Sequence, residues 1–422
     1  MPKKPRNALY AQSGGPTAVI NATAAGLILA ARRQRGRIGR VFAAHDGIIG
    51  ALTEDLYDTS RESARTIDRL RYLPGAAFGT CRYKLKGLEE SRAHYERLIE
   101  VFRAHDIGYF FYNGGNDSQD TSWKVSQLAE KMGYPLICVG VPKTVDNDLP
   151  LTDCCPGFGS AAKFIGTSIR ECAQDVASMA RTSTRVFIME VMGRNAGWLA
   201  AASGLAAEQD DDAPHLILFP EIPFRREEFL ARVRKVADER GSCVVVVSEG
   251  LRSPEGKIMA ESGARDAFGH PQLGGIAPQL ASLVQEELKL KVHWAVPDYM
   301  QRSARHVASK VDADQAFKLG EAAVKFALAG RNAVMPIIVR KSDAPYRWTI
   351  GAAELAEVAN QERELPRNYI SKDGWHITQA ARRYLLPLIQ GEDFPPFRGG
   401  LPFTQSLKNV RVPKRLTTGF QP

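Results

Sequence analysis

The residues with the clearest potential for chemistry lie in one segment, Val141-Pro-Lys-Thr-Val-Asp-Asn-Asp148. It holds two carboxylates, an amide, a hydroxyl and an ammonium group. Asp146 and Asp148 are two residues apart, so on an extended chain they share a face, where one could accept a proton while a metal ion or hydrogen bonds hold the other. Two plainer interpretations stay open: an ion pair with Lys143, and a turn formed by Asp and Asn.

The chain immediately before this segment is apolar. Pro135-Leu-Ile-Cys-Val-Gly-Val141 is typical of a buried parallel strand. In open α/β sheets, ligands bind beyond the carboxyl ends of such strands. The polar cluster therefore occupies a position at which a functional site is expected.

Two glycine-rich turns also follow predicted strands. Ser13-Gly-Gly-Pro-Thr-Ala-Val-Ile-Asn21 opens a helical stretch, so its backbone N–H groups could meet a phosphate with help from the helix dipole. Asn113-Gly-Gly-Asn-Asp-Ser-Gln-Asp120 repeats this arrangement. Together they favour one polyphosphate site between two strand ends; the alternative is a pair of tight turns that need glycine for steric reasons, the second capped by Asp117 or Ser118.

Three arginines are candidates for a bidentate grip on phosphate. Arg185 and Met192-Gly-Arg194 flank one predicted strand, and Arg302 ends the polar segment that starts at Tyr299. Any single one of them is more often a surface residue. The acidic run over 208–212 indicates a solvated loop, and the eight histidines lack metal-ligand spacing, so zinc is not supported.

Apolar strand-like runs alternate with helix-like stretches, which predicts parallel sheets with crossover helices, an α/β fold. Several runs end in glycine or polar residues, so the loops at strand ends hold the unusual side chains. The predicted strands are Ala8–Gln12, Val41–His45, Tyr109–Tyr112, Leu136–Val141, Val186–Val191, Leu216–Phe219 and Cys243–Val247.

The composition is that of a globular protein: 422 residues, 44% hydrophobic and 24% charged, which excludes disordered and fibrous classes. A net charge of +9, spread along the chain, favours phosphorylated metabolites over nucleic acid. No run approaches the ~18 apolar residues of a membrane span, and no signal peptide is apparent. Six cysteines without C-x-x-C spacing indicate reduced thiols. We therefore expect a cytoplasmic protein without a membrane partner.

Taken together, the motifs from Ser13 to about Arg302 resemble those of the 6-phosphofructokinase family, in the same order. The resemblance implies two Rossmann-like three-layer α/β/α domains of the phosphofructokinase type. The Pro-Lys-Thr-Val-Asp-Asn-Asp stretch is similar to that of the pyrophosphate-dependent branch, which carries lysine where ATP-dependent members carry glycine. The implied activity is reversible phosphorylation of fructose 6-phosphate by pyrophosphate with Mg²⁺, in glycolysis or gluconeogenesis.

The resemblance also implies roles for single residues. Asp146 is expected to take the proton from the sugar 1-hydroxyl, with Thr144 and Asp148 beside it, and Val145 is expected to bind the substrate. Gly15 and Arg82 match positions that contact the phosphoryl donor. The other residues expected to bind the sugar phosphate are Met192, Gly193, Arg194, Glu249, Tyr299, Met300, Gln301 and Arg302.

Arg185 matches a family position that reaches across a subunit interface to the 6-phosphate, which implies a homodimer or homotetramer. Asp117 stands where ATP-using relatives have glycine, so its carboxylate would repel the α-phosphate of a nucleotide, and Thr121 narrows the same floor. Lys143 replaces a second glycine and brings positive charge to the leaving phosphate. Asp117, Lys143 and Asp146 are thus the expected catalytic residues.

The sequence departs from the common family pattern at several positions. Asn116 occupies the place of a magnesium-associated aspartate, so we expect its neutral amide to act as a metal ligand, or Asp117 and phosphate oxygens to replace it. His293 lies where many relatives have a second cross-subunit arginine. Tyr299 lies where ATP-dependent members have histidine, and Pro16 replaces an acidic residue of the first glycine turn.

We expect a donor-binding domain with the catalytic loop over 1–156 plus roughly 303–355, a sugar-phosphate-binding domain over 157–302 plus parts of 356–393, and an extended C-terminal tail over 394–422. Three other functions stay open: an ATP-dependent 6-phosphofructokinase, a broader kinase that also accepts sedoheptulose 7-phosphate, and a catalytically silent sugar-phosphate sensor. Asp117 and Lys143 argue against the first. The complete set of Asp146, Arg194 and Glu249 argues against the last.

Overall fold

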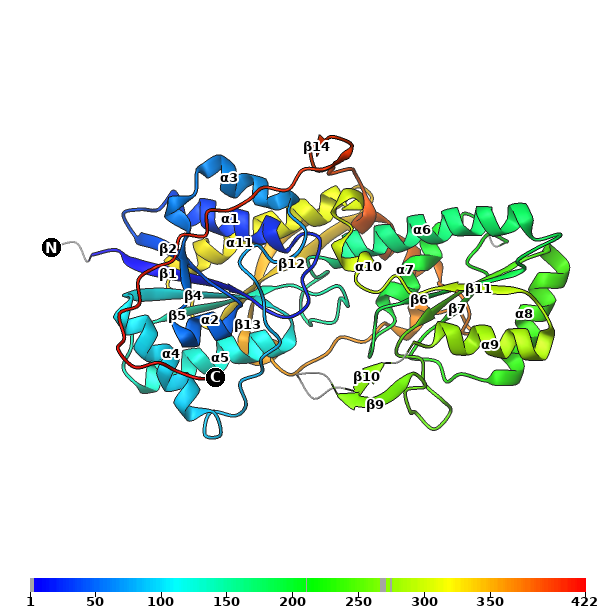
Figure 1. Ribbon diagram of the computed structural model, residues 1–422, viewed down its shortest axis with the longest axis horizontal. Helices are drawn as coiled ribbons and strands as arrows, with labels where there is room; N and C mark the ends of the chain where they lie inside the picture. Colours follow the sequence, from blue (N-terminus) through cyan, green and yellow to red (C-terminus); the bar gives the residue numbers. More distant parts are fainter. Residues whose placement is uncertain (1–3, 210, 266–270, 274) are drawn as a thin grey trace.

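The computed structural model of the protein describes residues 4–209, 211–265, 271–273 and 275–422. It has two lobes, each built around one main sheet (Figure 1). The strands of the first sheet are β1 (Arg6–Gln12), β2 (Ile38–Ala44), β3 (Leu56–Asp58), β4 (Ile107–Gly114), β5 (Ile137–Pro142), β12 (Val334–Asp343) and β13 (Tyr346–Glu354).

The first sheet has the order β13-β12-β5-β4-β1-β2-β3. Its five central strands are parallel, and the two edge strands pair antiparallel. The helices in sequence before β6 are α1 (Ile20–Arg32), α2 (Ile48–Thr53), α3 (Ala64–Arg69), α4 (Arg92–Ala104), α5 (Asn116–Lys131) and α6 (Phe158–Met179).

Two hydrophobic cores lie on opposite faces of this sheet. One is formed with α1, α3 and α11 (Lys310–Leu328), and the other with α2, α4 and α5. Helices α1 and α11 pack with their backbones nearly in contact, because a Cβ on Gly26 would lie 2.1 Å from the carbonyl oxygen of Phe317 and one on Gly320 would lie 2.2 Å from that of Thr23. A larger side chain at either glycine would push apart α1 and α11, the helices that cover one face of the first sheet.

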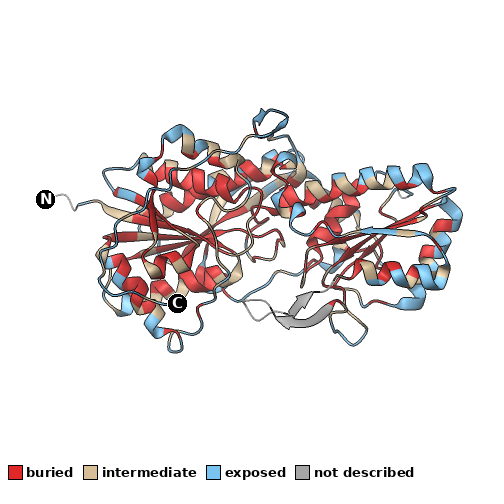
Figure 2. Ribbon diagram, viewed as in Figure 1, coloured by how far each residue is buried: buried red, intermediate tan, exposed pale blue. Residues whose placement is uncertain are grey.

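The second sheet is fully parallel, in the order β11-β6-β8-β7. Helices α6 and α7 cover one face and α8 and α9 the other, each over its own hydrophobic core (Figure 2). The elements are β6 (Val186–Val191), α7 (Trp198–Ser203), β7 (Leu216–Leu218), α8 (Arg226–Arg240), β8 (Cys243–Ser248), α9 (Ala277–Leu288) and β11 (Val292–Ala295).

The remaining elements are short and lie outside the two main sheets. They are the pair β9 (Glu261–Arg265) and β10 (Pro271–Leu273), the helices α10 (Met300–Ser303), α12 (Leu355–Val358) and α13 (Gln379–Leu385), and the pair β14 (Phe397–Arg398) and β15 (Leu401–Pro402).

The prediction of an α/β fold with two three-layer units is confirmed, and each of the seven predicted runs overlaps a strand. After α11 the chain returns to add β12 and β13 to the first sheet. We therefore retain the proposed domain division, in which residues 303–355 join the N-terminal part. No helix in the described ranges is long and apolar enough to cross a membrane.

The last residues run as an extended strip over the first lobe (Figure 1). The backbone N–H of Asp58 donates to the carbonyl oxygen of Val410 at 2.8 Å, and the N–H of Val412 donates to that of Leu56 at 2.8 Å. Further on, the buried Glu54 carboxylate accepts hydrogen bonds from the backbone of Arg415 and Leu416. The tail therefore pairs with the edge strand β3 and satisfies a buried charge.

Candidate active site

The carboxyl ends of both sheets face a shared pocket of about 550 Å³ between the lobes. Loops after β1, β4 and β5 contribute its first-lobe wall, and loops after β6 and β8 contribute the second. The lining residues are Ser13, Gly14, Gly15, Arg82, Lys84, Gly115, Asn116, Asp117, Ser118, Lys143, Thr144, Val145, Asp146, Asp148, Met192, Arg194, Asn195, Glu249, Asp298, Tyr299, Arg302, Asn360 and Glu362.

Two cations converge on the glycine turn after β1. Lys143 Nζ donates to the carbonyl oxygen of Gly15 at 2.9 Å. Gly14 adopts φ +69°, which favours glycine, and a Cβ on Gly15 would lie 2.3 Å from Arg302 Nη1, so the guanidinium lies directly against this turn. Helix α1 starts only at Ile20, so the predicted helix-dipole contribution does not act directly at this turn. The positive charge comes instead from the two side chains.

The second glycine turn does lead straight into a helix. Gly115 is the N-cap of α5, and Asp117 lies in the first helical turn. Lys84 Nζ lies 2.7 Å from the Asp117 carboxylate, so this acid is held by an ion pair and not by the capping bond considered from the sequence. The pair places one charge of each sign at the donor end of the pocket.

Asn116 has a role that the sequence did not suggest. Its Oδ1 accepts from the backbone N–H of Asn360 at 2.6 Å, and its Nδ2 donates to the carbonyl oxygen of Gln361. Both ends of the amide thus hold a distant segment of backbone. These contacts do not support the prediction that Asn116 is a metal ligand.

The loop with Asp146 and Asp148 is a turn and not an extended strand. Asn147 between them has φ +56°, in the left-handed region, which corrects the expectation that the two carboxylates share a face of an extended chain. The Asn147 amide is buried and stabilises this turn: Nδ2 donates to the Tyr384 hydroxyl at 3.0 Å, and Oδ1 accepts from the Cys155 N–H at 2.9 Å. Both aspartates nevertheless line the pocket.

Burial shifts the titration of this loop towards neutral forms. It raises the pKa of Asp146, against the stabilising charges of Lys143 and Arg194. Burial together with the Asp146 carboxylate raises the pKa of Asp148 to about 7. Burial, together with the guanidinium of Arg302, lowers the pKa of Lys143 to about 8. Such shifts concentrate at functional sites.

The second lobe supplies an ordered polar wall. The backbone N–H of Gly193 donates to Glu249 Oε1 at 3.2 Å, and the N–H of Met192 donates to Gln301 Oε1 at 3.1 Å. Burial and the charge of Asp146 raise the pKa of Glu249 to about 7. The Nε–H of Arg194 is buried and has no hydrogen-bond partner among the described residues. The wall thus offers a partly buried guanidinium and a carboxyl group next to the loop of Asp146.

Comparison with known proteins fits this arrangement. Residues 7–327 match the family described as Phosphofructokinase. The chain belongs to the phosphofructokinase family. The resemblance inferred from the motifs is therefore confirmed.

Relatives span most of the chain. A pyrophosphate–fructose 6-phosphate 1-phosphotransferase of Methylococcus capsulatus is 62% identical over 415 residues, covering 98% of this chain and 99% of the relative. An ATP-dependent 6-phosphofructokinase of Mycobacterium bovis is 33% identical over 303 residues, covering 71% of this chain and 80% of the relative. The crystal structure of a pyrophosphate-dependent phosphofructokinase from Marinobacter aquaeolei superposes with a TM-score of 0.91 at 57% identity, covering 99% of this chain and all of that one.

Most residues expected from the family motifs meet in this pocket, but four expected substrate-binding residues do not line it: Arg185, Gly193, Met300 and Gln301. Met300 is exposed, and Gln301 contributes through its bond to Met192. Arg185 lies at the opposite end of β6, where its guanidinium donates to the carbonyl oxygens of Gly241, at 3.1 Å, and Ala237. Its contact with a sugar phosphate would require a second subunit and stays a prediction.

Several pocket residues were not expected from the motifs: Lys84, Asn195, Asp298, Asn360 and Glu362. Each lies outside the segments that directly follow the predicted strands. A signal existed for Asn195, which is adjacent to the Met-Gly-Arg motif, and for Asp298, which precedes the segment from Tyr299 to Arg302. For Asn360 and Glu362 no local pattern indicates that residues so far along the chain return to the site.

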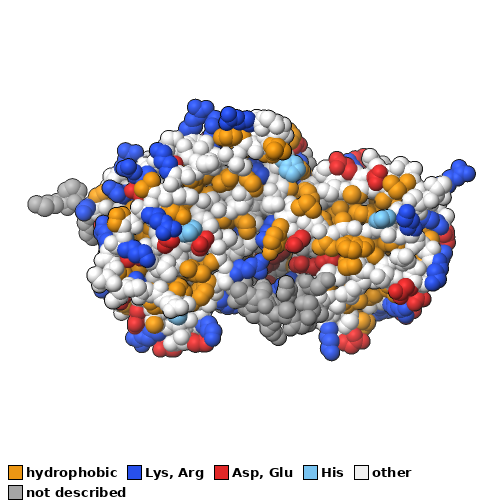
Figure 3. Space-filling view, viewed as in Figure 1, with side chains coloured by type: hydrophobic (Ala, Val, Ile, Leu, Met, Phe, Trp, Pro, Cys, Tyr) orange, Lys and Arg blue, Asp and Glu red, His pale blue; other side chains and the backbone are white. Residues whose placement is uncertain are grey.

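The pocket as a whole suits transfer of a phosphoryl group. Its first-lobe end holds Arg82, Lys84 and Lys143, with Arg302 against the glycine turn, which suits a polyanion. Asp146 lies next to this cluster, with the Arg194 wall beyond. On the face shown in Figure 3, Lys and Arg side chains are scattered among acidic and apolar ones.

Proposed function

We propose that this protein catalyses the reversible transfer of phosphate from pyrophosphate to the 1-hydroxyl of fructose 6-phosphate. The observation that carries the proposal is the convergence of Lys143 and Arg302 on the Gly14–Gly15 turn, beside the Asp117–Lys84 pair. An anion between these two cations would offset the burial and mutual repulsion that lower the pKa of Lys143 to about 8. The name of the Methylococcus capsulatus relative agrees with this donor.

The proposed chemistry is a single displacement. The 1-hydroxyl oxygen of the sugar forms a bond to one phosphorus of pyrophosphate, the bridging P–O bond breaks, and orthophosphate leaves. Asp146 accepts the hydroxyl proton and later releases it to solvent. Its carboxylate receives no hydrogen bond from another side chain among the described residues, so its oxygens face the pocket ready to accept that proton.

The cations have separate tasks in this scheme. Lys143 and Arg302 neutralise charge on the departing phosphate, which is the main requirement of phosphoryl transfer. Arg194 and the Gly193–Glu249 contact are placed for the sugar phosphate and its hydroxyls. In the reverse direction the same groups would bind fructose 1,6-bisphosphate and orthophosphate, and Asp146 would return the proton.

The residues fit Mg²⁺ in a limited way. Among the described residues no group of three or more His, Cys, Asp or Glu side chains is arranged to hold a metal. Mg²⁺ commonly binds one or two carboxylates together with phosphate oxygens and water, and Asp117 at the donor end is the carboxylate suited to this. When bound there, the ion would screen the phosphate charge during transfer.

We also propose where the enzyme is located and how its subunits associate. All six cysteines are free thiols, which suits a reducing cytoplasm. We further propose a homodimer or homotetramer, since Arg185 at the far end of β6 reaches a sugar phosphate only if a second subunit provides one.

Initial rates on fructose 6-phosphate with Mg²⁺ test the proposal, with pyrophosphate supplied in one series and ATP in the other. We expect turnover with pyrophosphate and none above background with ATP, and a turnover with pyrophosphate about 10²–10⁴-fold lower in Asp146→Asn. Turnover with ATP alone would show that the donor site has been misassigned. Turnover of sedoheptulose 7-phosphate in a parallel series would extend the sugar range without altering the donor.

A further inference from the structure

A short segment far along the chain crosses from one lobe to the other at the pocket. This crossing segment, residues 360–363, is held by the first lobe through the Asn116 amide and through Asn360 Nδ2, which donates to Asp120 Oδ1 at 3.0 Å. The second lobe holds it through Asn195, whose Nδ2 donates to both carboxylate oxygens of Glu362 at 3.2 and 3.1 Å. It therefore contacts both walls of the site.

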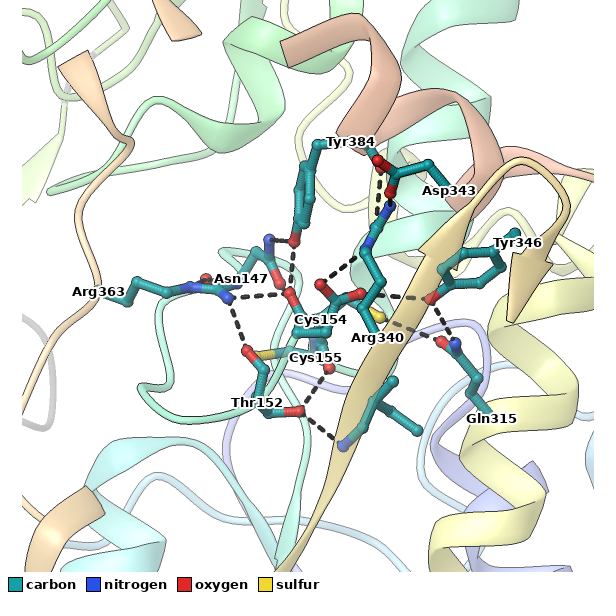
Figure 4. Close-up of polar contacts among 12 residues, drawn as sticks. Asn147, Thr152, Cys154, Cys155, Gln315, Arg340, Asp343, Tyr346, Arg363 and Tyr384 are labelled. Carbon is teal, nitrogen blue, oxygen red and sulfur yellow. Dashed lines mark hydrogen bonds and ion pairs between the residues drawn. The ribbon is translucent and has the colours of Figure 1, made fainter. Parts of the chain in front are cut away.

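Arg363, the last residue of the crossing segment, binds the backbone of the catalytic loop. Its Nε and Nη2 donate to the carbonyl oxygen of Asn147 at 3.1 and 2.7 Å. Its Nη1 donates to the carbonyl oxygens of Thr152 and Asp153 at 2.6 and 2.9 Å. Its own N–H donates to the carbonyl oxygen of Asp148 at 2.7 Å. Figure 4 shows the guanidinium directed at this loop.

The second lobe fixes Arg363 in turn. The indole N–H of Trp198 donates to the Arg363 carbonyl oxygen at 3.1 Å, and the guanidinium carbon lies 4.7 Å from the centroid of the indole ring. Trp198 begins α7 in the second lobe, whereas Asn147, which lies between the two pocket aspartates, belongs to the first. Arg363 contacts both residues and therefore connects the two lobes.

We propose that Arg363 is a positioning residue for catalysis: its guanidinium holds the left-handed turn at Asn147 and so fixes the Asp146 carboxylate relative to the second-lobe wall that binds the sugar. The inference rests on the proposed function. Phosphate-binding groups do not depend on this contact, because Lys143 is tied to Gly15 and Gly114 of the first lobe and Arg302 lies against Gly15. Loss of the guanidinium fork should therefore reduce turnover more than binding.

The family match ends at residue 327, so the crossing segment lies beyond the part of the chain that the family description covers. A fork of several N–H donors is what distinguishes Arg from Lys at this position, since an ammonium cannot reach three carbonyl oxygens in the same geometry. A displacement of about 1 Å at a reacting group costs on the order of 10²-fold in rate.

The test compares Arg363→Lys with Arg340→Lys in the full-length protein. Arg340 is a matched control, because it donates to Asp153 Oδ1 at 2.9 Å and to the carbonyl oxygen of Tyr384 at 3.0 Å in the same polar cluster but does not contact residues 146–148 (Figure 4). We expect kcat with pyrophosphate to fall about 10²-fold in Arg363→Lys, with both KM values changed less than about threefold and with little change of kcat in Arg340→Lys.

Equal kcat losses in the two variants, at temperatures where circular dichroism shows both folded, would overturn the proposal. So would a loss confined to KM. If Arg363→Lys does not fold, Trp198→Phe decides: it removes the N–H bond to the Arg363 carbonyl, and we expect a smaller decrease of kcat at unchanged KM, whereas unchanged kcat would refute the role. Inactive wild-type protein with pyrophosphate would instead refute the proposed function itself.

Discussion

The two sides of the loop over residues 143–155 differ sharply in how their polar groups are satisfied. On the pocket side, Asp148 Oδ1 and Arg194 Nε are buried and have no hydrogen-bond partner in the described part of the chain. On the opposite side, the Asn147 amide is bonded at both ends, and the carbonyl oxygens of Thr152 and Asp153 accept from Arg363. The same backbone segment therefore separates a pocket side with unpaired polar groups from an opposite side, the saturated side, on which the polar groups named here are hydrogen-bonded.

This difference shows where the protein accepts an energetic cost. Unpaired buried polar groups and like charges are destabilising, typically by 1–3 kcal/mol for each unsatisfied group. Such a cost is common at functional sites, where a ligand supplies the missing partners. The saturated side holds the turn in one conformation, so that the groups on the pocket side are placed before substrate binds. The predictions below act on one side or the other.

The largest effect is expected for Asp146→Asn on the pocket side. The amide keeps the shape of the side chain but cannot accept the proton of the sugar hydroxyl, so kcat should fall by about 10²–10⁴-fold with a small change in KM. Steady-state kinetics at saturating pyrophosphate measure this. A variant that retains more than a tenth of the wild-type kcat would remove Asp146 from the role of base.

The donor side of the pocket should respond to the double change Asp117→Gly and Lys143→Gly. Loss of the Lys143 ammonium should reduce kcat/KM for pyrophosphate by about 10²–10³-fold. Loss of Asp117 releases Lys84 from its 2.7 Å ion pair, so this cation becomes available to a nucleotide phosphate, and ATP-supported turnover should appear. The two single variants are the controls, and unchanged donor preference in the double variant would contradict the assignment.

Asp148→Asn should stabilise the protein above neutral pH. Because the folded-state pKa is raised to about 7 from 3.8, the folded protein keeps a proton that the unfolded chain releases, and the free energy of unfolding falls as pH rises between these values. The variant does not have this pH-dependent loss, so at pH 8 its free energy of unfolding should exceed that of wild type by up to about 4 kcal/mol, with little difference at pH 4. Urea unfolding at both pH values measures the difference, and an equal change at both would disprove the cause.

The smallest effect is expected on the saturated side, for Tyr384→Phe. The change removes the hydroxyl that accepts from Asn147 Nδ2 and donates to the carbonyl oxygen of Asp153, which should lower the free energy of unfolding by about 1–2 kcal/mol. Arg363 still holds the loop, so kcat should fall by less than about threefold. A loss of kcat as large as that of Arg363→Lys would show that the hydroxyl, and not the guanidinium fork, positions the turn.

Local sequence signals predicted much of this arrangement. Apolar runs ending in glycine or polar residues located the strands from β1 to β8 that bear the site, because parallel strands bring their carboxyl ends to one edge. The edge strand β13 alternates partly exposed side chains and gave no apolar run. A turn formed by Asp and Asn was one of the interpretations left open, but the left-handed backbone of Asn147 and its buried amide bonds depend on Tyr384, 237 residues away in sequence.

The same limit explains the pocket residues that the motifs did not supply. Glu362 and Arg363 act through contacts with the catalytic loop and with the second lobe, and nothing in their own neighbourhood of charged residues indicates such partners. The role of Lys84 likewise follows from its ion pair with Asp117, which the sequence around Lys84 does not indicate. The roles of these residues depend on contacts between segments far apart in the sequence, which spacing along the chain cannot show, whereas the motifs can be recognised from that spacing.

The most direct test of the account is the reverse reaction followed by ³¹P NMR, with wild-type protein, fructose 1,6-bisphosphate, orthophosphate and Mg²⁺. The account predicts that a pyrophosphate signal appears together with fructose 6-phosphate, and that both form about 10²–10⁴-fold more slowly with Asp146→Asn. If the wild-type protein binds both substrates but no pyrophosphate signal forms, the assignment of Lys143 and Arg302 to the pyrophosphate site is contradicted.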